Sequence, residues 1–465
     1  MLKVAVSKIP DIIFLDNLRK ITELDIAIVL SAESELQRAI ENFYGSTDFQ
    51  EMISSSEVDT AKQDYIQEKA DSKMDLEATL TEAAKGPVVR LVDVLIKRAL
   101  DDRASDIHIE PFLDKINIRY RIDGVLYELP PPPRELHNAM ISRVKILSKM
   151  DIAEKRIPQD GSFSFQYKGR HIDVRVSTIP IVFGEKVVMR ILDKRTDLLN
   201  LQALGFESEQ LEIFEKALMR PYGLILATGP TGSGKSTTLY AALNKRLSPE
   251  VNILTIEDPV EYQISGISQV EVKADIGLTF ASGLRAFLRQ DPDVILVGEV
   301  RDLETAEICI RASLTGHLVL STLHTNDAVT AMTRLIDIGI QSYLVASSIG
   351  LVVAQRLVRV LCAHCKEPYK IDPKTREDYK IPAETFYKAK GCEKCRNIGY
   401  WGRVAIYEAL PIDEDIRRLI TKDSDLEKLR QIQKEKRYAT LFQSGLKKAE
   451  RGETSLEEVL SVAYE

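Results

Sequence analysis

A glycine-rich run in the middle of the chain has the residue types and spacing of a phosphate-binding loop. The run reads Gly229-Pro-Thr-Gly-Ser-Gly-Lys-Ser236 and lies between a strand-like segment and a helix-like one. Glycines let successive backbone N–H groups point at a phosphate, Lys235 can reach the β- and γ-phosphates, and the Ser236 hydroxyl can ligate Mg²⁺. The helix N-terminus adds a favourable field for an anion. The residues predicted to bind ATP and Mg²⁺ are Gly229, Pro230, Thr231, Gly232, Ser233, Gly234, Lys235, Ser236 and Thr237.

Two further strand-like runs are followed by carboxylates that suit phosphoryl transfer. Glu299 follows the run 294–297, and an acidic cluster from Glu257 to Glu261 follows the run 253–256. Open α/β sheets bind their ligands where such strands end. Glu299 could orient or deprotonate the attacking water, or hold Mg²⁺ through a water molecule. The sequence leaves these roles open.

Histidines and arginines supply further candidates. His317 and His324 bracket the run 318–323, and their spacing argues against a shared metal, although one of them could bond a phosphate or the acidic cluster. An arginine inserted at the γ-phosphate can raise the rate of transfer by about 10³–10⁵-fold. Spacing alone does not choose among Arg119, Arg121, Arg134, Arg175, Arg190, Arg285, Arg289 and Arg301.

Four of the five cysteines form two CxxC pairs, Cys362 with Cys365 and Cys392 with Cys395. Four thiolates are the complement of a tetrahedral structural zinc site, although the intervening loop is longer than the commonest spacing. We expect Zn²⁺ to organise residues 360–400 and assign it no catalytic role. The fifth cysteine, Cys309, is expected in the core.

The composition is typical of a globular protein and argues against nucleic acid as the main binding partner. The 465 residues carry a net charge of −7, whereas proteins that bind DNA phosphates usually have a basic surplus. The start of the chain has no secretory signal pattern. The longest uncharged stretch, residues 338–355, is interpreted as a buried helix with its connections, because a membrane span needs about 20 apolar residues. We therefore expect a cytoplasmic protein that reaches membranes only through partners.

Hydrophobic periodicity divides the chain. Short alternating runs from residue 105 to 193, with helix-like segments before and among them, predict an α+β domain with an antiparallel sheet. From residue 199 onward strands alternate with helices, which predicts an α/β domain with a parallel sheet covered on both faces. The expected parts are a small N-terminal piece (1–45), a polar linker (46–86), the α+β domain (87–198) and the α/β domain (199–465), which includes the zinc module (360–410) and a helical tail (411–465).

With these residues assembled, the chain resembles the ATPases of type II secretion and type IV pilus assembly from about residue 87 to its end. The resemblance implies a PAS-like domain followed by a RecA-like P-loop ATPase domain. Besides the phosphate loop, it is carried by Ala104-Ser-Asp-Ile-His-Ile-Glu110, Arg156-Ile-Pro-Gln-Asp-Gly161, the acidic box at Glu257 to Glu261, Gln290-Asp-Pro-Asp-Val-Ile-Leu-Val-Gly-Glu299 and Leu314-Thr-Gly-His-Leu-Val-Leu-Ser-Thr-Leu-His324.

The resemblance also implies roles and partners. Members of the family form homo-hexamers at the cytoplasmic side of the inner membrane, and their ATP turnover drives a membrane platform protein. Glu299 matches the catalytic glutamate, and the matched arginines reach nucleotide phosphates, some across a subunit boundary. The candidate catalytic residues are Glu299, Lys235, Glu261, Glu257, His324, Arg119, Arg134, Arg285 and Arg289.

Within the family, the cysteine module argues against the retraction motors. The segments 152–156 and 187–193 favour the type II secretion branch, with the pilus assembly ATPase as the near alternative. Residues 1–45 resemble only the later part of the usual N-terminal domain, which docks a cytoplasmic partner, so we expect a deleted start. Acidic phospholipid is a further expected partner. A RecA-like nucleic-acid motor, opposed by the acidic balance, and a scaffold that binds nucleotide without turnover are the alternatives from other classes.

Overall fold

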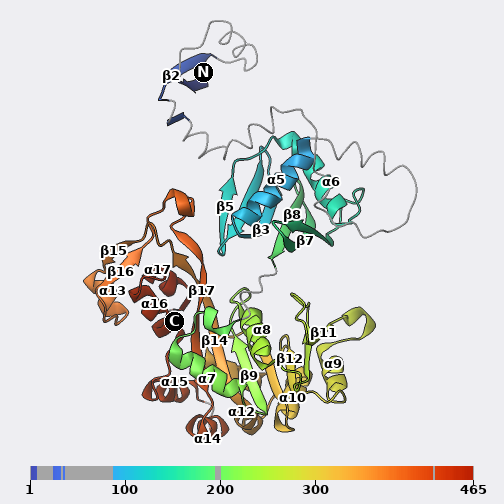
Figure 1. The fold of residues 1–465 in the computed structure, drawn as a ribbon, viewed down its shortest axis with the longest axis vertical. Helices are drawn as coiled ribbons and strands as arrows, with labels where there is room; N and C mark the ends of the chain where they lie inside the picture. The colour runs from blue at the N-terminus through green and yellow to red at the C-terminus, as the bar shows by residue number, and fades with distance from the viewer. Residues whose placement is uncertain are drawn as a thin grey trace. The chain divides into compact units, whose positions relative to one another are not determined.

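The computed structural model describes residues 2–7, 25–32, 35–36, 87–193, 200–422 and 425–463. The chain divides into two compact units, Met1–Lys194 and Arg195–Glu465 (Figure 1). Each unit has its own sheets. The predicted polar linker and most of the expected N-terminal piece, residues 1–45, lie outside the described residues.

The first unit holds a two-stranded and a six-stranded sheet. Strands β1 (Leu2–Val6) and β2 (Ile26–Leu30) pair in parallel. The larger sheet is antiparallel in the order β5-β4-β3-β8-β7-β6. Its strands are β3 (Ala104–Pro111), β4 (Ile116–Ile122), β5 (Val125–Leu129), β6 (Gln159–Tyr167), β7 (Arg170–Ile181) and β8 (Gly184–Asp193). Within residues 87–193, the helical elements are α5 (Pro87–Asp101), the 3-10 turn η1 (Arg134–Leu136) and α6 (His137–Leu147).

Alternation along the strands of the larger sheet separates an apolar face from a charged one. In β4, every second side chain is buried, including Ile118 and Tyr120. Helix α5 packs against this core, where the Tyr120 hydroxyl donates to the Leu95 carbonyl. The intervening positions carry charge, such as Arg119, which pairs with Glu110 on β3. A period of two in the sequence thus places a packed face and a polar face on one sheet.

The second unit is built on a seven-stranded sheet in the order β11-β10-β12-β13-β9-β14-β17. All neighbouring strands pair in parallel except β14 and β17, which are antiparallel. The central strands are buried throughout, which explains their continuous apolar sequences. The strands are β9 (Gly223–Thr228), β10 (Ile253–Glu257), β11 (Ser268–Glu271), β12 (Val294–Val297), β13 (Leu318–Leu323), β14 (Ile349–Leu361) and β17 (Tyr400–Pro411).

Helices cover both faces of this sheet (Figure 1). Ile225 and Ala227 pack with α7 (Ser208–Leu218) and α8 (Lys235–Arg246), whereas Leu224 and Leu226, one position away, pack in the core of the opposite face. That face is covered by α9 (Phe280–Phe287), α10 (Leu303–Leu314), α11 (Ala328–Asp337), α12 (Ser342–Ser348), α14 (Glu414–Lys422) and α15 (Leu426–Glu435). Further helical elements of this unit are η3 (Leu201–Ala203), η4 (Ala274–Ile276), α16 (Leu441–Glu450) and α17 (Leu456–Ala463).

The cysteine-bearing segment lies between β14 and β17 in the sequence. It contains β15 (Glu367–Lys370), α13 (Pro373–Asp378), β16 (Thr385–Lys388) and the 3-10 turn η5 (Glu393–Cys395). Ile381 and Phe386 pack with Leu446 of α16 and Val459 of α17 in a separate apolar cluster, beside which β15, β16 and α13 lie in Figure 1. The predicted helical tail therefore helps to hold this segment.

One sequence-based interpretation needs correction. Of the uncharged stretch 338–355, only α12 is α-helical; α11 ends at Asp337, and from Ile349 onward the chain is strand β14. A short apolar run that is buried on all sides has the same composition in a helix and in a central strand, so periodicity could not separate them. Among the described residues, no helix combines the length and apolar character that crossing a membrane requires.

Candidate functional site

The phosphate loop joins the end of β9 to the start of α8, and its glycines are required by the backbone. Gly229, Gly232 and Gly234 have φ angles of 149°, 79° and 89°, in the region that side chains disfavour. A Cβ on Gly229 would also lie 2.5 Å from the carbonyl oxygen of Gln355. The Oγ of Ser233 is buried and has no hydrogen-bond partner among the described residues. A curled backbone with an unpaired buried hydroxyl fits a polyphosphate ligand.

Lys235 is the buried cation of this loop. Its ammonium donates to the carbonyl oxygens of Gly229, at 2.8 Å, and Pro230, at 3.0 Å. Burial lowers the pKa of Lys235 to about 8, while the negative charge of Glu299 acts in the opposite direction. Ser236, the predicted Mg²⁺ ligand, is the next residue of α8 and is exposed. A cation held among carbonyls at a helix N-terminus is placed to receive an anion.

Glu299 follows β12 and is held from two sides. One carboxylate oxygen forms an ion pair with Arg301, and the other lies 3.4 Å from Nε2 of His324, just after β13. Arg301 also lies 4.0 Å from Asp258, after β10. At the end of β9, the Thr228 hydroxyl lies 2.6 Å from that of Thr325. The parallel order β10-β12-β13-β9 therefore gathers the acidic residues, His324 and the phosphate loop at one edge of the sheet.

The other predicted carboxylates have different surroundings. Glu257 is buried and accepts hydrogen bonds from the hydroxyls of Tyr240, on α8, and Thr255, the latter at 2.6 Å. The carboxylate of Glu257 thus ties β10 to the helix that follows the phosphate loop. Glu261 is exposed, and its backbone N–H donates to Tyr240 at 3.3 Å. A catalytic role for Glu257 or Glu261 stays a prediction.

The four arginines of the candidate set lie in different places. Arg285, on α9, pairs with Glu304 of α10, and Arg289 donates to the Arg285 carbonyl at 2.8 Å. Arg119 and the exposed Arg134 belong to the first unit, where Arg119 pairs with Glu110. The structure thus divides these arginines between the two units, and their contacts with nucleotide stay predictions.

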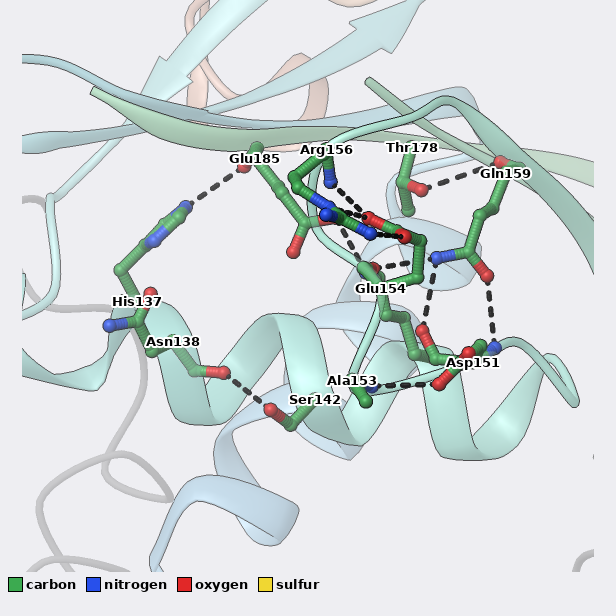
Figure 2. A network of polar contacts seen from close by, with 11 residues as sticks. His137, Asn138, Ser142, Asp151, Ala153, Glu154, Arg156, Gln159, Thr178 and Glu185 are labelled. Atoms are coloured by element: carbon green, nitrogen blue, oxygen red, sulfur yellow. Dashed lines mark hydrogen bonds and ion pairs between the residues drawn. The ribbon is translucent and has the colours of Figure 1, made fainter. Parts of the chain in front are cut away.

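The motif Arg156-Ile-Pro-Gln-Asp-Gly161 runs from an exposed loop into the start of β6 and is held by hydrogen bonds to neighbouring residues (Figure 2). Gln159 accepts from the N–H of Asp151 at 2.9 Å and donates to the carbonyl of Glu154 at 2.9 Å. The buried ammonium of Lys145 donates to that same carbonyl at 2.7 Å and pairs with Glu185 at 2.5 Å. The side chain of Arg156 is 87% exposed and bonded to Glu154. Sequence analysis missed Lys145 and Glu185, because no local pattern marks a buried ion pair between distant residues.

The four CxxC cysteines converge as predicted. Their sulfur atoms all lie within 4.8 Å of one another, close enough to share one metal ion. Burial raises the pKa of Cys365 to about 12. Burial acts in the same direction on Cys395, but N–H groups of Cys392 and Gly399, each 3.2 Å from its sulfur, outweigh it and lower the pKa to about 7. Four clustered sulfur donors fit Zn²⁺. Cys309 is buried in the core, as expected.

Comparisons with known proteins agree with this geometry. Residues 81–461 match the family model described as type II/IV secretion system protein. The type IV pilus assembly ATPase PilB of Myxococcus xanthus is 44% identical over 97% of this chain and 80% of its own length. The type II secretion system ATPase E of Vibrio cholerae is 50% identical over 82% of this chain and 76% of its own length.

Solved structures share the fold. The pilus retraction motor PilT with bound ADP has a TM-score of 0.54 and 29% identity, covering 80% of this chain and 96% of that one. The ATPase DotB of Legionella pneumophila has a TM-score of 0.61 and 21% identity, covering 80% of this chain and 95% of that one. The resemblance inferred from the sequence is confirmed: the chain belongs to the type II/IV secretion system protein family.

Proposed function

We propose that this chain hydrolyses ATP to drive assembly of the pseudopilus and protein export by type II secretion. The observation that carries the proposal is the sheet edge where the phosphate loop, Lys235 and Glu299 come together. Relatives named as secretion and pilus ATPases support the same activity. In this proposal Glu299 orients or deprotonates the attacking water, with His324 fixing one of its oxygens.

The residues of the loop fit Mg²⁺-ATP. Backbone N–H groups around Gly232 and Gly234 and the ammonium of Lys235 would bind the phosphates, and Ser236 would hold the metal ion. Mg²⁺, when bound, neutralises the negative charge that develops on the phosphate oxygens. Lys235 already has its cation buried in the loop, so no reorganisation of charge is needed when the nucleotide arrives.

We propose further that the active form is a homo-hexamer. Arg119 and Arg134 lie in the first unit, on a part of the chain separate from the phosphate loop. In this proposal, these two arginines and also Arg285 and Arg289 bind nucleotide phosphates, some of them across a subunit boundary. This role accounts for their match to the family's arginines. We also propose that residues 87–198 form a PAS-like domain and that residues 1–45 dock a partner. The other domain limits given above are part of the same proposal.

The proposed machine works at the cytoplasmic face of the inner membrane. Its partners would be a platform protein of that membrane, a cytoplasmic-domain protein that docks the N-terminal part, and acidic phospholipid. Type IV pilus assembly remains the second candidate, because the match to PilB of Myxococcus xanthus extends over 97% of this chain. Complementation of strains that lack either motor separates the two: the type II candidate restores export and not piliation.

Turnover is tested with Glu299→Gln in the full chain. We expect the variant to bind Mg²⁺-ATP while its steady-state release of phosphate falls by at least about 100-fold, because an amide does not accept a proton from water. Unchanged hydrolysis would remove Glu299 from the mechanism, and a wild-type chain that binds ATP without turnover would favour a scaffold. Stimulation by DNA with a steep salt dependence would favour a nucleic-acid motor.

The zinc proposal is tested by Cys362→Ser. Losing one of four thiolates should release the metal and loosen residues 360–400, since metal affinity and local folding are coupled. Elemental analysis and limited proteolysis measure both effects, with Cys309→Ser as the matched control for a buried cysteine outside the cluster. An unaltered cleavage pattern together with no zinc in the wild-type chain would contradict the proposal.

A further inference from the structure

We propose that Gln355 is the positioning residue that holds the phosphate loop in its ligand-binding shape. The inference rests on the proposed binding of nucleotide and adds to it a residue outside the loop. Gln355 lies on β14 with only 2% of its surface exposed. Its neighbour Ala354 is paired with Thr228, the last residue of β9, so Gln355 stands beside the point where the phosphate loop begins.

Gln355 packs against both ends of the phosphate loop. Its carbonyl oxygen lies 2.5 Å from the place where a Cβ on Gly229 would be, at the start of the loop. Its side-chain nitrogen Nε2 lies 2.8 Å from the corresponding point on Gly234, at the end of the loop. Gly234 is also the N-cap of α8. Close packing against Gln355 thus leaves no room for a side chain at Gly229 or Gly234.

A chain of buried hydroxyls bonds the amide of Gln355 on the side away from the phosphate loop. The Thr238 hydroxyl donates to Oε1 of Gln355 at 2.9 Å and lies 3.1 Å from the Tyr407 hydroxyl. A threonine hydroxyl has a single proton, so Tyr407 must donate to Thr238 while Thr238 donates to the amide. Burial raises the pKa of Tyr407, which keeps its phenol protonated. The –NH₂ group of Gln355 therefore faces the phosphate loop.

This orientation matters for an anionic ligand. The first N–H groups of α8 and those of the loop form the cradle, and small displacements of such donors weaken binding. A glutamate at position 355 would keep the acceptor for Thr238 but place a negatively charged oxygen against Gly234. A leucine would keep the volume and lose every hydrogen bond. The two changes thus separate charge from packing.

The test measures binding of Mg²⁺-ADP to the nucleotide-free full chain by isothermal titration calorimetry. We expect Gln355→Glu to weaken binding by at least about 30-fold and Gln355→Leu by about tenfold. Thr238→Val, which removes the hydroxyl that bonds both the amide of Gln355 and Tyr407, should weaken binding by about threefold. The double variant Thr238→Val/Gln355→Leu should bind as Gln355→Leu does, because both changes act through one amide.

Gln210→Leu is the matched control. Gln210 is equally buried, and its Nε2 donates to the Tyr407 carbonyl at 2.6 Å. This control should lower the melting temperature and leave the affinity for Mg²⁺-ADP unchanged, whereas a purely structural role for Gln355 would make the two glutamines behave alike. Wild-type affinity in folded Gln355→Glu and Thr238→Val would overturn the inference. A wild-type chain that binds no Mg²⁺-ADP would instead overturn the proposed function.

Discussion

Two buried lysines show how differently this chain uses a cation. Lys145 in the first unit has a carboxylate partner, Glu185, and donates to the carbonyl of Glu154. Lys235 in the second unit donates only to carbonyls of its own loop, and no ion pair involves it among the described residues. The first arrangement is electrostatically complete and serves structure. The second is a buried charge that no salt bridge neutralises among the described residues, although the charge of Glu299 acts on it, and a phosphate ligand would supply a direct partner.

The loops above these lysines differ in the same way. In the loop of residues 151–161, side chains such as Gln159 and Glu154 satisfy the backbone, and a Cβ on Gly161 would lie 2.4 Å from the Ser148 carbonyl. In the phosphate loop, the Ser233 hydroxyl is buried and has no partner within the part of the chain that the structure describes. Both loops match motifs of the family, but the phosphate loop keeps a buried polar group open to a ligand.

The largest effect should come from removing the unpaired cation. We expect Lys235→Ala to lower ATP turnover by at least about 10³-fold, because the β- and γ-phosphates lose their positive partner. Steady-state phosphate release measures this loss, and the far-ultraviolet circular dichroism should match that of the wild type. Turnover within tenfold of the wild type would remove Lys235 from the site and end the contrast between the two lysines.

Removing the paired cation should act on stability instead. Lys145→Ala leaves Glu185 buried without its partner, which should cost about 3–5 kcal/mol of the free energy of unfolding of the first unit. Urea denaturation measures it. The double variant Lys145→Met/Glu185→Met should recover most of the loss, because two apolar side chains replace both charges. A single variant as stable as the wild type would mean that the pair contributes nothing to the loop above it.

A smaller effect should appear in the pH dependence of nucleotide binding. Burial lowers the pKa of Lys235 to about 8 without a bound nucleotide, so the ammonium is present below pH 8 and is lost as the pH rises above it. The bound phosphate requires the charged form. Affinity for Mg²⁺-ADP should therefore be nearly constant below pH 7 and fall by about tenfold between pH 7 and pH 9.

Lys235→Arg sharpens this test, because a guanidinium stays charged over the whole range. Its affinity for Mg²⁺-ADP, although lower at neutral pH, should change little between pH 7 and pH 9. An equal decline in the variant and the wild type would assign the titration to another group.

Most of the candidate site could be predicted from short sequence motifs. The phosphate loop, Glu299 and the four cysteines are recognisable because their chemistry depends on residues close together in the sequence, and the alternation of strands and helices predicted the parallel sheet. The structure brings these elements together as an open α/β sheet should.

What sequence analysis missed depends on pairings between distant residues. The strand β14 was interpreted as part of a helix because its apolar run carries no period of its own. Its partner β17 was not predicted, so the hydroxyl chain from Tyr407 to Gln355 could not be seen. Lys145 and Glu185 are 40 positions apart, and only the fold of the six-stranded sheet makes them neighbours.

Strand β14 extends from the back of the nucleotide cradle to the edge of the cysteine cluster, with a register shift between Arg359 and Leu361. Gln355 and Cys362 are separated by a few residues, most of which pair with β17. One paired strand thus connects the two sites directly. We therefore expect oxidation or metal loss at the four thiols to weaken nucleotide binding. The affinity of the ATPase for nucleotide would then depend on the redox state and the zinc supply of the cell.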